Sequence, residues 1–299
     1  MCIRDRSDTA FNPVVEAEAQ TKRRSRLRAV FSKDRKAQFG LVVLVLFILG
    51  AFLAPVLAPY DPNEMTLNMM SGPSGDNMLG TDDLGRDLFS RILWGTQISL
   101  FVGVATVALA LVFGVLLGVL AGYYGGWIDM VIMRYIDLQW AFPNFIIAVY
   151  LVAVFGTGLL NVIVAIALAF LDDFARVARS MVLTLKQEQY IDAAKVQGFS
   201  DFRIMMRHIL PNAIAPIIVQ ATVSVSYAIL GEASLSFLGL GVSSDTPTWG
   251  LILADGRSFI SRAWWLGVFP GLAIMLVVLS INFIGDGLRD ALDVRESDV

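Results

Sequence analysis

This chain contains few of the side chains that enzymes use for catalysis. Those that are present are not spaced as in a known catalytic motif. His208 is the single histidine and Cys2 the single cysteine, which excludes multi-histidine metal sites and internal disulfides. No lysine follows a glycine, so the phosphate-binding loop Gly-x-x-x-x-Gly-Lys-Ser/Thr is absent from the sequence. The Gly-x-Ser-x-Gly nucleophile elbow is absent as well. We therefore expect no catalytic residue, no metal and no cofactor in this chain.

One polar segment is conspicuous because long uncharged stretches flank it. Residues 190–212 contain acids, bases and helix-forming residues, and they separate two stretches that are apolar enough for a lipid environment. A charged segment between membrane spans is exposed to water. We interpret it as a surface on which a soluble partner docks.

The composition determines the class of protein around this segment. Hydrophobic residues make up 56% of the 299-residue chain and charged residues only 16%, which is too apolar for an ordinary soluble domain. A helix needs roughly 20 apolar residues to cross a bilayer. We predict an all-α polytopic membrane protein with six transmembrane helices, at about 38–59, 98–123, 135–156, 158–178, 209–231 and 263–285.

The remaining segments form the tails and loops between these helices. Gly156 and Gly158 are expected to separate the third span from the fourth. Two tails are expected, a basic one over 1–37 and a short one over 288–299. A loop with an amphipathic interface helix is expected over 60–97 and a second loop over 179–210. The last five spans and their loops are expected to form one domain over 98–287.

The distribution of basic residues predicts the orientation. Eight Lys and Arg residues lie between Lys22 and Lys36, whereas residues 59–97 are acidic. Since basic residues favour the cytoplasmic side, we expect both termini and the 179–210 loop in the cytoplasm. The first span leads into further membrane segments, so we interpret it as a retained anchor rather than a cleaved signal.

The polar segment resembles the cytoplasmic "EAA" loop of ATP-binding-cassette importer permeases. That pattern is Glu-Ala-Ala, three residues, Gly, nine residues, Ile, one residue, Leu-Pro. The matching or neighbouring positions are Tyr190, Asp192, Ala193, Ala194, Gly198, Arg207, His208, Leu210 and Pro211. The resemblance implies that this segment couples the permease to a partner ATPase.

The residues of this segment fit a compact helix-turn-helix. Adjacent alanines allow close approach of another surface, Gly198 can adopt the positive φ that ends a helix, and Ser200 can cap the next helix. Pro211 suits the first turn of the fifth span. The segment departs from the family pattern in two places, because Asp192 replaces the usual Glu and His208 replaces Ile. The open alternative is an ordinary charged loop.

Residues 79–100 resemble the segment before the second span in C-type subunits of the dipeptide/oligopeptide permease family. Residues 232–241, 246–250 and 269–293 resemble the same subfamily, so the likeness extends over about 35–293. It implies a type I importer core of five helices with one extra leading helix, in a multi-pass protein of the bacterial inner membrane. The implied partners are a second homologous permease, two ATPases that bind ATP-Mg, a periplasmic or lipid-anchored binding protein and membrane lipid, with no nucleic acid.

The resemblance leaves the cargo open among dipeptides, oligopeptides, nickel chelates, opines and glutathione. A secondary transporter or a membrane scaffold without transport activity would be the alternatives from other classes. The sequence has neither the inverted repeats nor the intramembrane coupling residues typical of a secondary carrier.

Two further groups of residues are functional candidates. On the outer side we expect Thr81 to cap an amphipathic helix and Asp82, Arg86, Asp87 and Glu232 to contact a partner. The alternatives are a simple amphipathic lead-in to the second span for the first group of residues, and a solvated carboxylate or a role in the transport pathway for Glu232. Candidates for the transport pathway are Pro143, Asn144, Asp172 and Asp173. Their alternatives are a packing kink at Pro143 and local pairing of the two aspartates with Arg176.

Overall fold

A computed structural model describes residues 34–243 and 245–292, and every described regular element is helical. The helices and their bounds are α2 (Arg35–Phe52), α3 (Ala54–Leu57), α4 (Leu88–Tyr124), α5 (Gly126–Trp140), α6 (Asn144–Phe155), α7 (Leu159–Ala169), α8 (Leu171–Leu185), α9 (Gln189–Val196), α10 (Asp201–Ile204), a π-helical turn (Met205–Ile209), α11 (Leu210–Phe237), α12 (Trp249–Gly256), a 3-10 turn (Arg257–Phe259) and α13 (Trp265–Leu292). The residues before 34 and after 292, which include most of the expected tails, lie outside the described part.

Helix length and composition identify the membrane spans. Within the described residues, α2, α4, the continuous helical run Asp201–Phe237 and α13 are each long and apolar enough to cross a bilayer. The pair α5 and α6 makes a fifth candidate, bent by 92° at its break. The expected fourth span is divided at Phe170 into α7 and α8. An all-helical polytopic architecture is therefore confirmed. The described residues contain four or five candidate spans where six were expected, because the segment expected as the fourth span is divided into two short helices.

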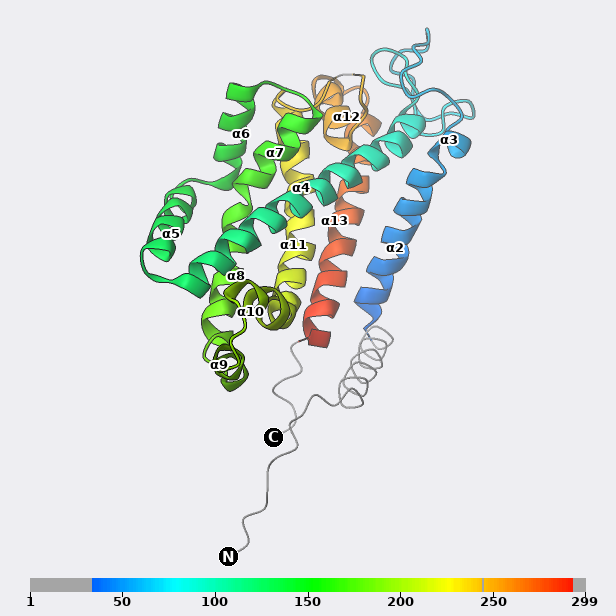
Figure 1. Cartoon of the computed structure of the whole chain (residues 1–299). Coiled ribbons are helices and arrows are strands. Elements are labelled where there is room, and N and C mark those ends of the chain that lie inside the picture. Colours follow the sequence, from blue (N-terminus) through cyan, green and yellow to red (C-terminus); the bar gives the residue numbers. More distant parts are fainter. Residues whose placement is uncertain (1–33, 244, 293–299) are drawn as a thin grey trace, which may run out of the picture.

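Figure 1 shows how the helices are arranged. The cytoplasmic candidates α9 and α10 lie at one end of the bundle, together with the start of α2 and the end of α13. The loop over 58–87, α3 and α12 lie at the opposite end, and α4 crosses the bundle obliquely between the two ends. This arrangement agrees with the expected alternation of segments between the two sides of the membrane.

Close packing of α4 on α8 forms the centre of the bundle. Gly114, Gly118 and Gly122 follow each other at intervals of four residues along α4, and their faces meet the α8 backbone. A Cβ atom at Gly118 would lie 2.3 Å from the carbonyl oxygen of Ala175, a distance that no side chain tolerates. Small residues at such spacing let two membrane helices approach closely. The glycines of α4 therefore determine where α8 lies.

The leading helix α2 packs on α13 in a similar way. A Cβ atom at Gly40 would lie 2.6 Å from the carbonyl oxygen of Ser280, and the rings of Phe39 and Phe283 meet edge to face at 6.4 Å. The rest of α2 exposes large apolar side chains. The helix is thus attached to the bundle along one narrow face.

Two helices extend beyond the expected limits of their spans. The helix of the second span begins at Leu88, ten residues before the expected 98, and Asp87 rather than Thr81 caps it through a hydrogen bond from the Ser90 N–H. Residues 81–87 form a tight loop in which Thr81 pairs with Asp87 as an isolated bridge. The amphipathic segment is therefore the first turns of the spanning helix and not a separate interface helix. The last helix extends beyond the expected 285 to Leu292.

The glycines that were expected to divide the third and fourth spans do so. Gly156 has φ +93° and Gly158 has φ +128°, and residues with a side chain rarely adopt such conformations. The chain reverses there, so that α7 packs against α6. The bend before α6 lies at Ala141–Pro143, with Pro143 at the N-cap position.

Candidate functional site

The segment 189–209 forms a compact projection at the end of the bundle, which we call the knob. Helix α9 buries Ile191 and Ala194 against the bundle and exposes Asp192 and Ala193 on its outer face. Asp192 pairs with Lys195 at 3.1 Å on the same exposed surface. The sequence therefore presents one alanine of the pair to a partner and uses the other for packing.

Gly198 ends α9 in the way its residue type predicts. Its φ of +77° lies in the left-handed region. The Phe199 N–H donates to the Ala194 carbonyl at 3.1 Å and the Gly198 N–H donates to the Lys195 carbonyl at 2.9 Å. This pair of hydrogen bonds is the Schellman motif, which a glycine in this position stabilises. The expected helix-ending role of Gly198 is confirmed.

The second half of the knob differs from the expectation at Ser200. This residue occupies the N-cap position of α10, but its side chain makes no capping hydrogen bond. Pro211 lies in the first turn of α11 as expected, and that helix continues the helical run of the knob through the π-helical turn Met205–Ile209. A π-helical turn shifts the hydrogen-bond spacing from four to five residues, and the Leu210 N–H accordingly donates to the Met205 carbonyl. The knob is thus joined to α11 without a loop.

Stacked side chains hold the knob together internally. The rings of Phe199 and His208 stack at 5.8 Å with an interplanar angle of 16°, and the guanidinium of Arg203 lies 5.3 Å from the Phe199 ring centroid. The amide of Asn212 donates to the His208 carbonyl at 2.7 Å. His208, which replaces the apolar residue of the family pattern, therefore packs inside the knob rather than facing a partner.

The outer surface of the knob includes large apolar residues, of which only Tyr190 was expected from the sequence. Val196 and Phe202 are largely exposed, and Tyr190 and Met206 are exposed to a lesser degree. The sequence could have indicated this surface, because these apolar residues lie within an otherwise polar segment. Together with exposed Asp192, Ala193 and Arg207, they form a mixed surface of the kind that binds another protein.

A hydrogen bond connects the knob to the bundle. The Tyr123 hydroxyl donates to the Asp201 carboxylate at 2.7 Å, and Tyr123 lies in the last turn of α4. A displacement of the knob therefore acts on α4 at this contact and on α11 through the continuous helix.

The outer candidates lie inside the chain in this structure, contrary to the expectation of partner contact. Asp82, Arg86 and Asp87 are at most 5% exposed. Arg86 pairs with Asp82 at 2.6 Å and with Asp255 at 3.3 Å, and Arg91 lies 3.4 Å from the same Asp255 carboxylate. Burial raises the pKa of Asp255 above its ordinary value, and the two guanidiniums oppose this rise. These charges fasten the 58–87 loop to α12.

Asp87 and one carboxylate oxygen of Glu232 also have hydrogen-bond partners within the chain, whereas the Oε2 atom of Glu232 has none among the described residues. Asp87 accepts from Asn77 at 2.9 Å and from the Ser90 hydroxyl at 2.8 Å. Glu232 is 1% exposed and accepts from the hydroxyls of Ser236 and Thr248 at 2.7 and 2.8 Å. Their observed partners thus belong to the chain itself, and Glu232 connects α11 to the start of α12.

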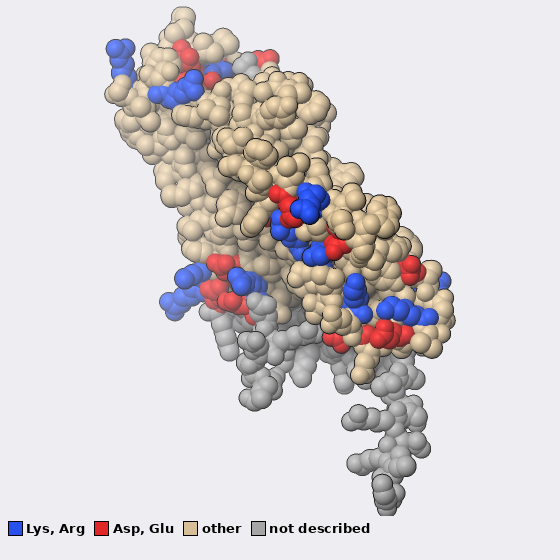
Figure 2. All heavy atoms as spheres, turned by 90° about the vertical axis from the view of Figure 1, so that its left-hand side faces the viewer, with Lys and Arg blue, Asp and Glu red and all other residues tan. Residues whose placement is uncertain are grey.

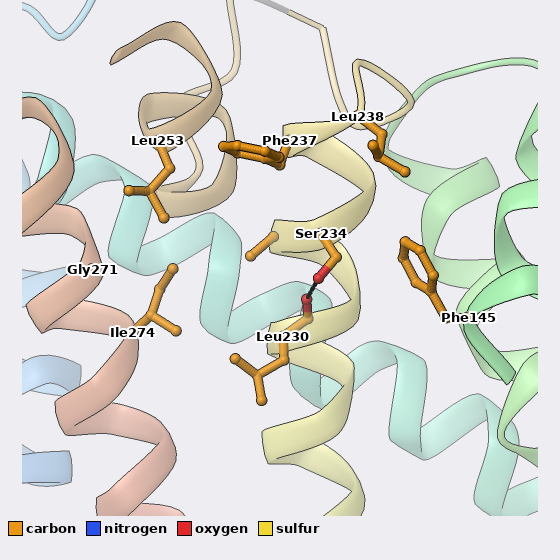
Figure 3. A pocket seen from close by; sticks show the side chains of 9 residues that line it. Phe145, Leu230, Ser234, Phe237, Leu238, Leu253, Gly271 and Ile274 are labelled. Atoms are coloured by element: carbon orange, nitrogen blue, oxygen red, sulfur yellow. Dashed lines mark hydrogen bonds between the residues drawn. The ribbon is translucent and has the colours of Figure 1, made fainter. Parts of the chain in front are cut away.

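The pathway candidates do not gather in one place. Asn144 lines a cavity of about 230 Å³ between α6, α7 and α11. A larger cavity of about 470 Å³ lies between α6, α11, α12 and α13, and apolar side chains surround it (Figure 3). Its one hydroxyl, that of Ser234, donates to the Leu230 carbonyl at 2.7 Å within the same helix. The two cavities share Phe145, Leu230 and Ser234.

Asp172 lines neither cavity. It is fully buried in the first turn of α8, and its Oδ1 accepts from Gln139 at 3.4 Å. The expected local pairing with Arg176 is wrong, because the guanidinium of Arg176 pairs with Asp137 on α5 instead. Arg176 pairs with Asp137 because α5 packs against α8 and presents the more exposed carboxylate of Asp137 to the guanidinium.

With this geometry described, the comparisons with known proteins decide the family. Residues 114–298 match the family of binding-protein-dependent transport system inner membrane components. The chain belongs to this family. It is a multi-pass permease subunit of the inner membrane and a non-catalytic component of an ATP-binding-cassette importer, which excludes the secondary-carrier and scaffold alternatives. Residues 25–74 also match the N-terminal transmembrane domain of oligopeptide transport permease C.

Curated relatives in this family are similar over nearly the whole chain. A dipeptide transport system permease from Alkalihalophilus pseudofirmus is 48% identical over 96% of this chain and 91% of its own length. A di/tripeptide permease from Pseudomonas aeruginosa is 44% identical over 89% of this chain and 90% of its own length. A glutathione permease from Pectobacterium atrosepticum is 46% identical over 86% of this chain and 85% of its own length.

A solved structure shares the fold of this permease. An inward-facing form of the methionine ABC transporter MetNI matches with a TM-score of 0.54 and 20% identity, over 69% of this chain and 97% of the matched chain. The expected type I importer core is therefore confirmed.

Proposed function

We propose that this permease imports dipeptides or tripeptides, paired with a second homologous permease and driven by two cytoplasmic ATPases through the knob. The main support for the cargo is the 48% identity to a dipeptide permease over 96% of the chain. The main support for the coupling role is the knob itself, which combines an exposed docking surface with a continuous helical connection into α11.

The orientation follows from the same proposal. The knob, the start of α2 and the end of α13 lie at one end of the bundle (Figure 1), and basic residues concentrate in the sequence before α2. The positive-inside tendency then places this end, with both termini, in the cytoplasm. ATP binding would draw the ATPases together, move the knob and open the bundle toward the outside. Hydrolysis would reset it.

Glutathione is the second candidate cargo, because a glutathione permease is 46% identical over 86% of the chain. Both cargoes are short peptides with a free carboxylate. The apolar lining of the larger cavity does not select between them.

Reconstitution tests the proposal. The complete transporter, purified with its partner permease and ATPases, is placed in vesicles with ATP on the ATPase side and the binding protein on the other. We expect ATP-dependent accumulation of a labelled dipeptide, and competition by unlabelled glutathione measures the second candidate. Accumulation without the ATPases would contradict the coupling role, and accumulation of neither peptide would contradict the cargo.

A further inference from the structure

The loop of residues 58–87 presents large apolar side chains to the outside. Leu67 is 97% exposed, and Met65, Met69 and Met78 are each more than half exposed. We call these four residues the methionine tip. Soluble surfaces rarely display several large apolar side chains together unless a partner covers them.

The backbone beneath the tip is held in one conformation by hydrogen bonds. The Thr66 hydroxyl donates to the Gly85 carbonyl at 2.7 Å, and the Ser71 N–H donates to the Thr81 hydroxyl at 2.9 Å. The indole N–H of Trp265 donates to the Thr81 carbonyl at 3.1 Å, which attaches the loop to α13. The apolar residues are therefore displayed by an ordered loop.

One backbone conformation within the tip is strained. Met70 has φ +49°, the single positive φ of a residue other than glycine among those described. Such conformations are costly and persist where the surrounding structure enforces them, often at ligand-contacting sites. Here the Met70 N–H donates to the Asp82 carbonyl at 2.8 Å, so the loop folds back at this residue and directs its neighbours outward.

The exposed charged side chains of residues 58–85 are all acidic. Asp61, Glu64 and Asp76 are exposed, and residues 58–85 contain no Lys or Arg. The Tyr60 hydroxyl donates to the Asp76 carbonyl at 3.1 Å, which brings the two limbs of the loop together. An apolar centre with a charged rim is the usual composition of a protein–protein interface. Anionic lipid headgroups would be repelled by the same acidic rim.

The position of the tip restricts the partner further. Figure 1 shows the 58–87 loop at the end of the bundle opposite the knob. The ATPases approach the knob, so the soluble partner available at this end is the binding protein on which this family of transporters depends. Methionine side chains are flexible and adapt to an irregular apolar surface, as a contact that forms and breaks in each transport cycle requires.

We propose that the methionine tip is a docking contact for the binding protein, and that the binding protein offers it an apolar depression edged by Lys and Arg. This inference rests on the proposed function, because it requires the 58–87 loop to lie outside the cell. It also replaces the buried Asp82, Arg86 and Asp87 as the surface that a partner can reach.

The test measures dipeptide uptake by the reconstituted transporter while the concentration of peptide-loaded binding protein is varied. The double variant Leu67→Asp with Met69→Asp should raise the concentration needed for half-maximal uptake at least tenfold, because it places charge in the apolar contact. The matched control, Leu67→Met with Met69→Leu, keeps size and polarity and should behave as wild type. A second variant, Glu64→Lys with Asp76→Lys, should also raise the half-maximal concentration and make it less sensitive to salt.

The outcomes separate this inference from the proposed function. If wild-type vesicles accumulate no peptide, the proposed function fails. If wild type transports and the aspartate variant has an unchanged half-maximal concentration, the docking contact is overturned. Loss of co-purification with the second permease in the aspartate variant would instead place the tip in the permease interface and also overturn the inference.

Discussion

The guanidinium of Arg176 pairs with Asp137 at 2.9 Å and lies 4.5 Å from the ring centroid of Trp140. Arg179, one helical turn further along α8, donates two hydrogen bonds of 2.6 Å each to Asp129. Figure 2 shows Lys, Arg, Asp and Glu side chains gathered in the middle of one face of the bundle, apart from the further charged groups at its top and bottom. Ion pairs therefore hold the bent helix α5 against α8, in addition to the apolar packing of Ile136 on Leu171 and Ala175.

The two ion pairs should differ in strength. The Asp129 and Arg179 side chains are 22% and 30% exposed, against 53% and 33% for Asp137 and Arg176. A double-mutant cycle with alanine should give a coupling of about 1 kcal/mol for Asp129–Arg179 and close to zero for the more exposed pair. Thermal unfolding of the purified protein in detergent measures both. Equal couplings would contradict the expectation that the less exposed ion pair is the stronger one.

The buried charges of the 58–87 loop should be essential for its attachment. Asp82→Asn leaves Arg86 and Arg91 with a single shared carboxylate in a buried site, which should destabilise the protein by about 3 kcal/mol. Asp83→Asn, at the neighbouring half-buried position, removes the same charge without breaking an observed pair and serves as the control. Limited proteolysis of the loop reports the effect, and equal cleavage of the two variants would refute the attachment.

The glycines of α4 should tolerate no side chain. Gly118→Ala places a Cβ 2.3 Å from the Ala175 carbonyl oxygen, so α4 and α8 must separate, and overpacking of this kind costs about 1–3 kcal/mol. Gly271→Ala is the matched control, because Gly271 also lies within a spanning helix but has no atom within 4 Å of its Cβ position. The control should be neutral or stabilising by up to about 1 kcal/mol. Comparable unfolding temperatures would disprove the close α4–α8 contact.

Asp172→Asn should stabilise the protein. The Asp172 carboxylate is fully buried, and its Oδ2 has no hydrogen-bond partner among the described residues. An uncompensated buried polar atom costs about 1–3 kcal/mol, and an amide of the same shape avoids the burial of charge. A lower unfolding temperature of the variant would show that the carboxylate has an ionic partner in the assembled transporter.

The proposal that Asp172 and Asp173 influence the pathway makes a separate prediction. Replacing both by asparagine should change the preference between cationic and neutral peptides in vesicle uptake, because the acidic charge near the cytoplasmic exit is lost. An unchanged preference would limit both residues to a structural role.

The sequence was sufficient for most of the architecture because lipid imposes strict requirements. Uninterrupted apolar stretches predicted the spans, and Gly156 and Gly158 predicted the reversal between α6 and α7 through their freedom to adopt positive φ. The bend before α6 could be placed at Pro143, but its 92° angle could not be predicted. That angle depends on contacts such as Arg176–Asp137, which join residues 39 positions apart.

The functional residues were harder to predict than the helices, because whether a charged side chain is buried depends on the folded chain and not on the local sequence. Gly198 ends its helix as its residue type indicates, since the left-handed conformation is a local requirement. Asp82 faces inward because it pairs with Arg86 and Arg91, which also bind Asp255 from a distant part of the sequence. Glu232 faces inward toward Thr248. Their charge suggested exposure, whereas the fold turns both inward.

The knob is the central element of this account, and one variant tests it most directly. Ala193 is exposed on α9, so Ala193→Trp should fold normally and obstruct the surface to which the ATPase docks, while Ala193→Ser is the matched control. Peptide uptake and ATP hydrolysis are measured in the same vesicles. We predict that the tryptophan variant loses at least nine-tenths of ATP-driven uptake, and that its remaining ATP hydrolysis no longer responds to the binding protein, with the serine variant like wild type. Wild-type uptake by the tryptophan variant would contradict the account.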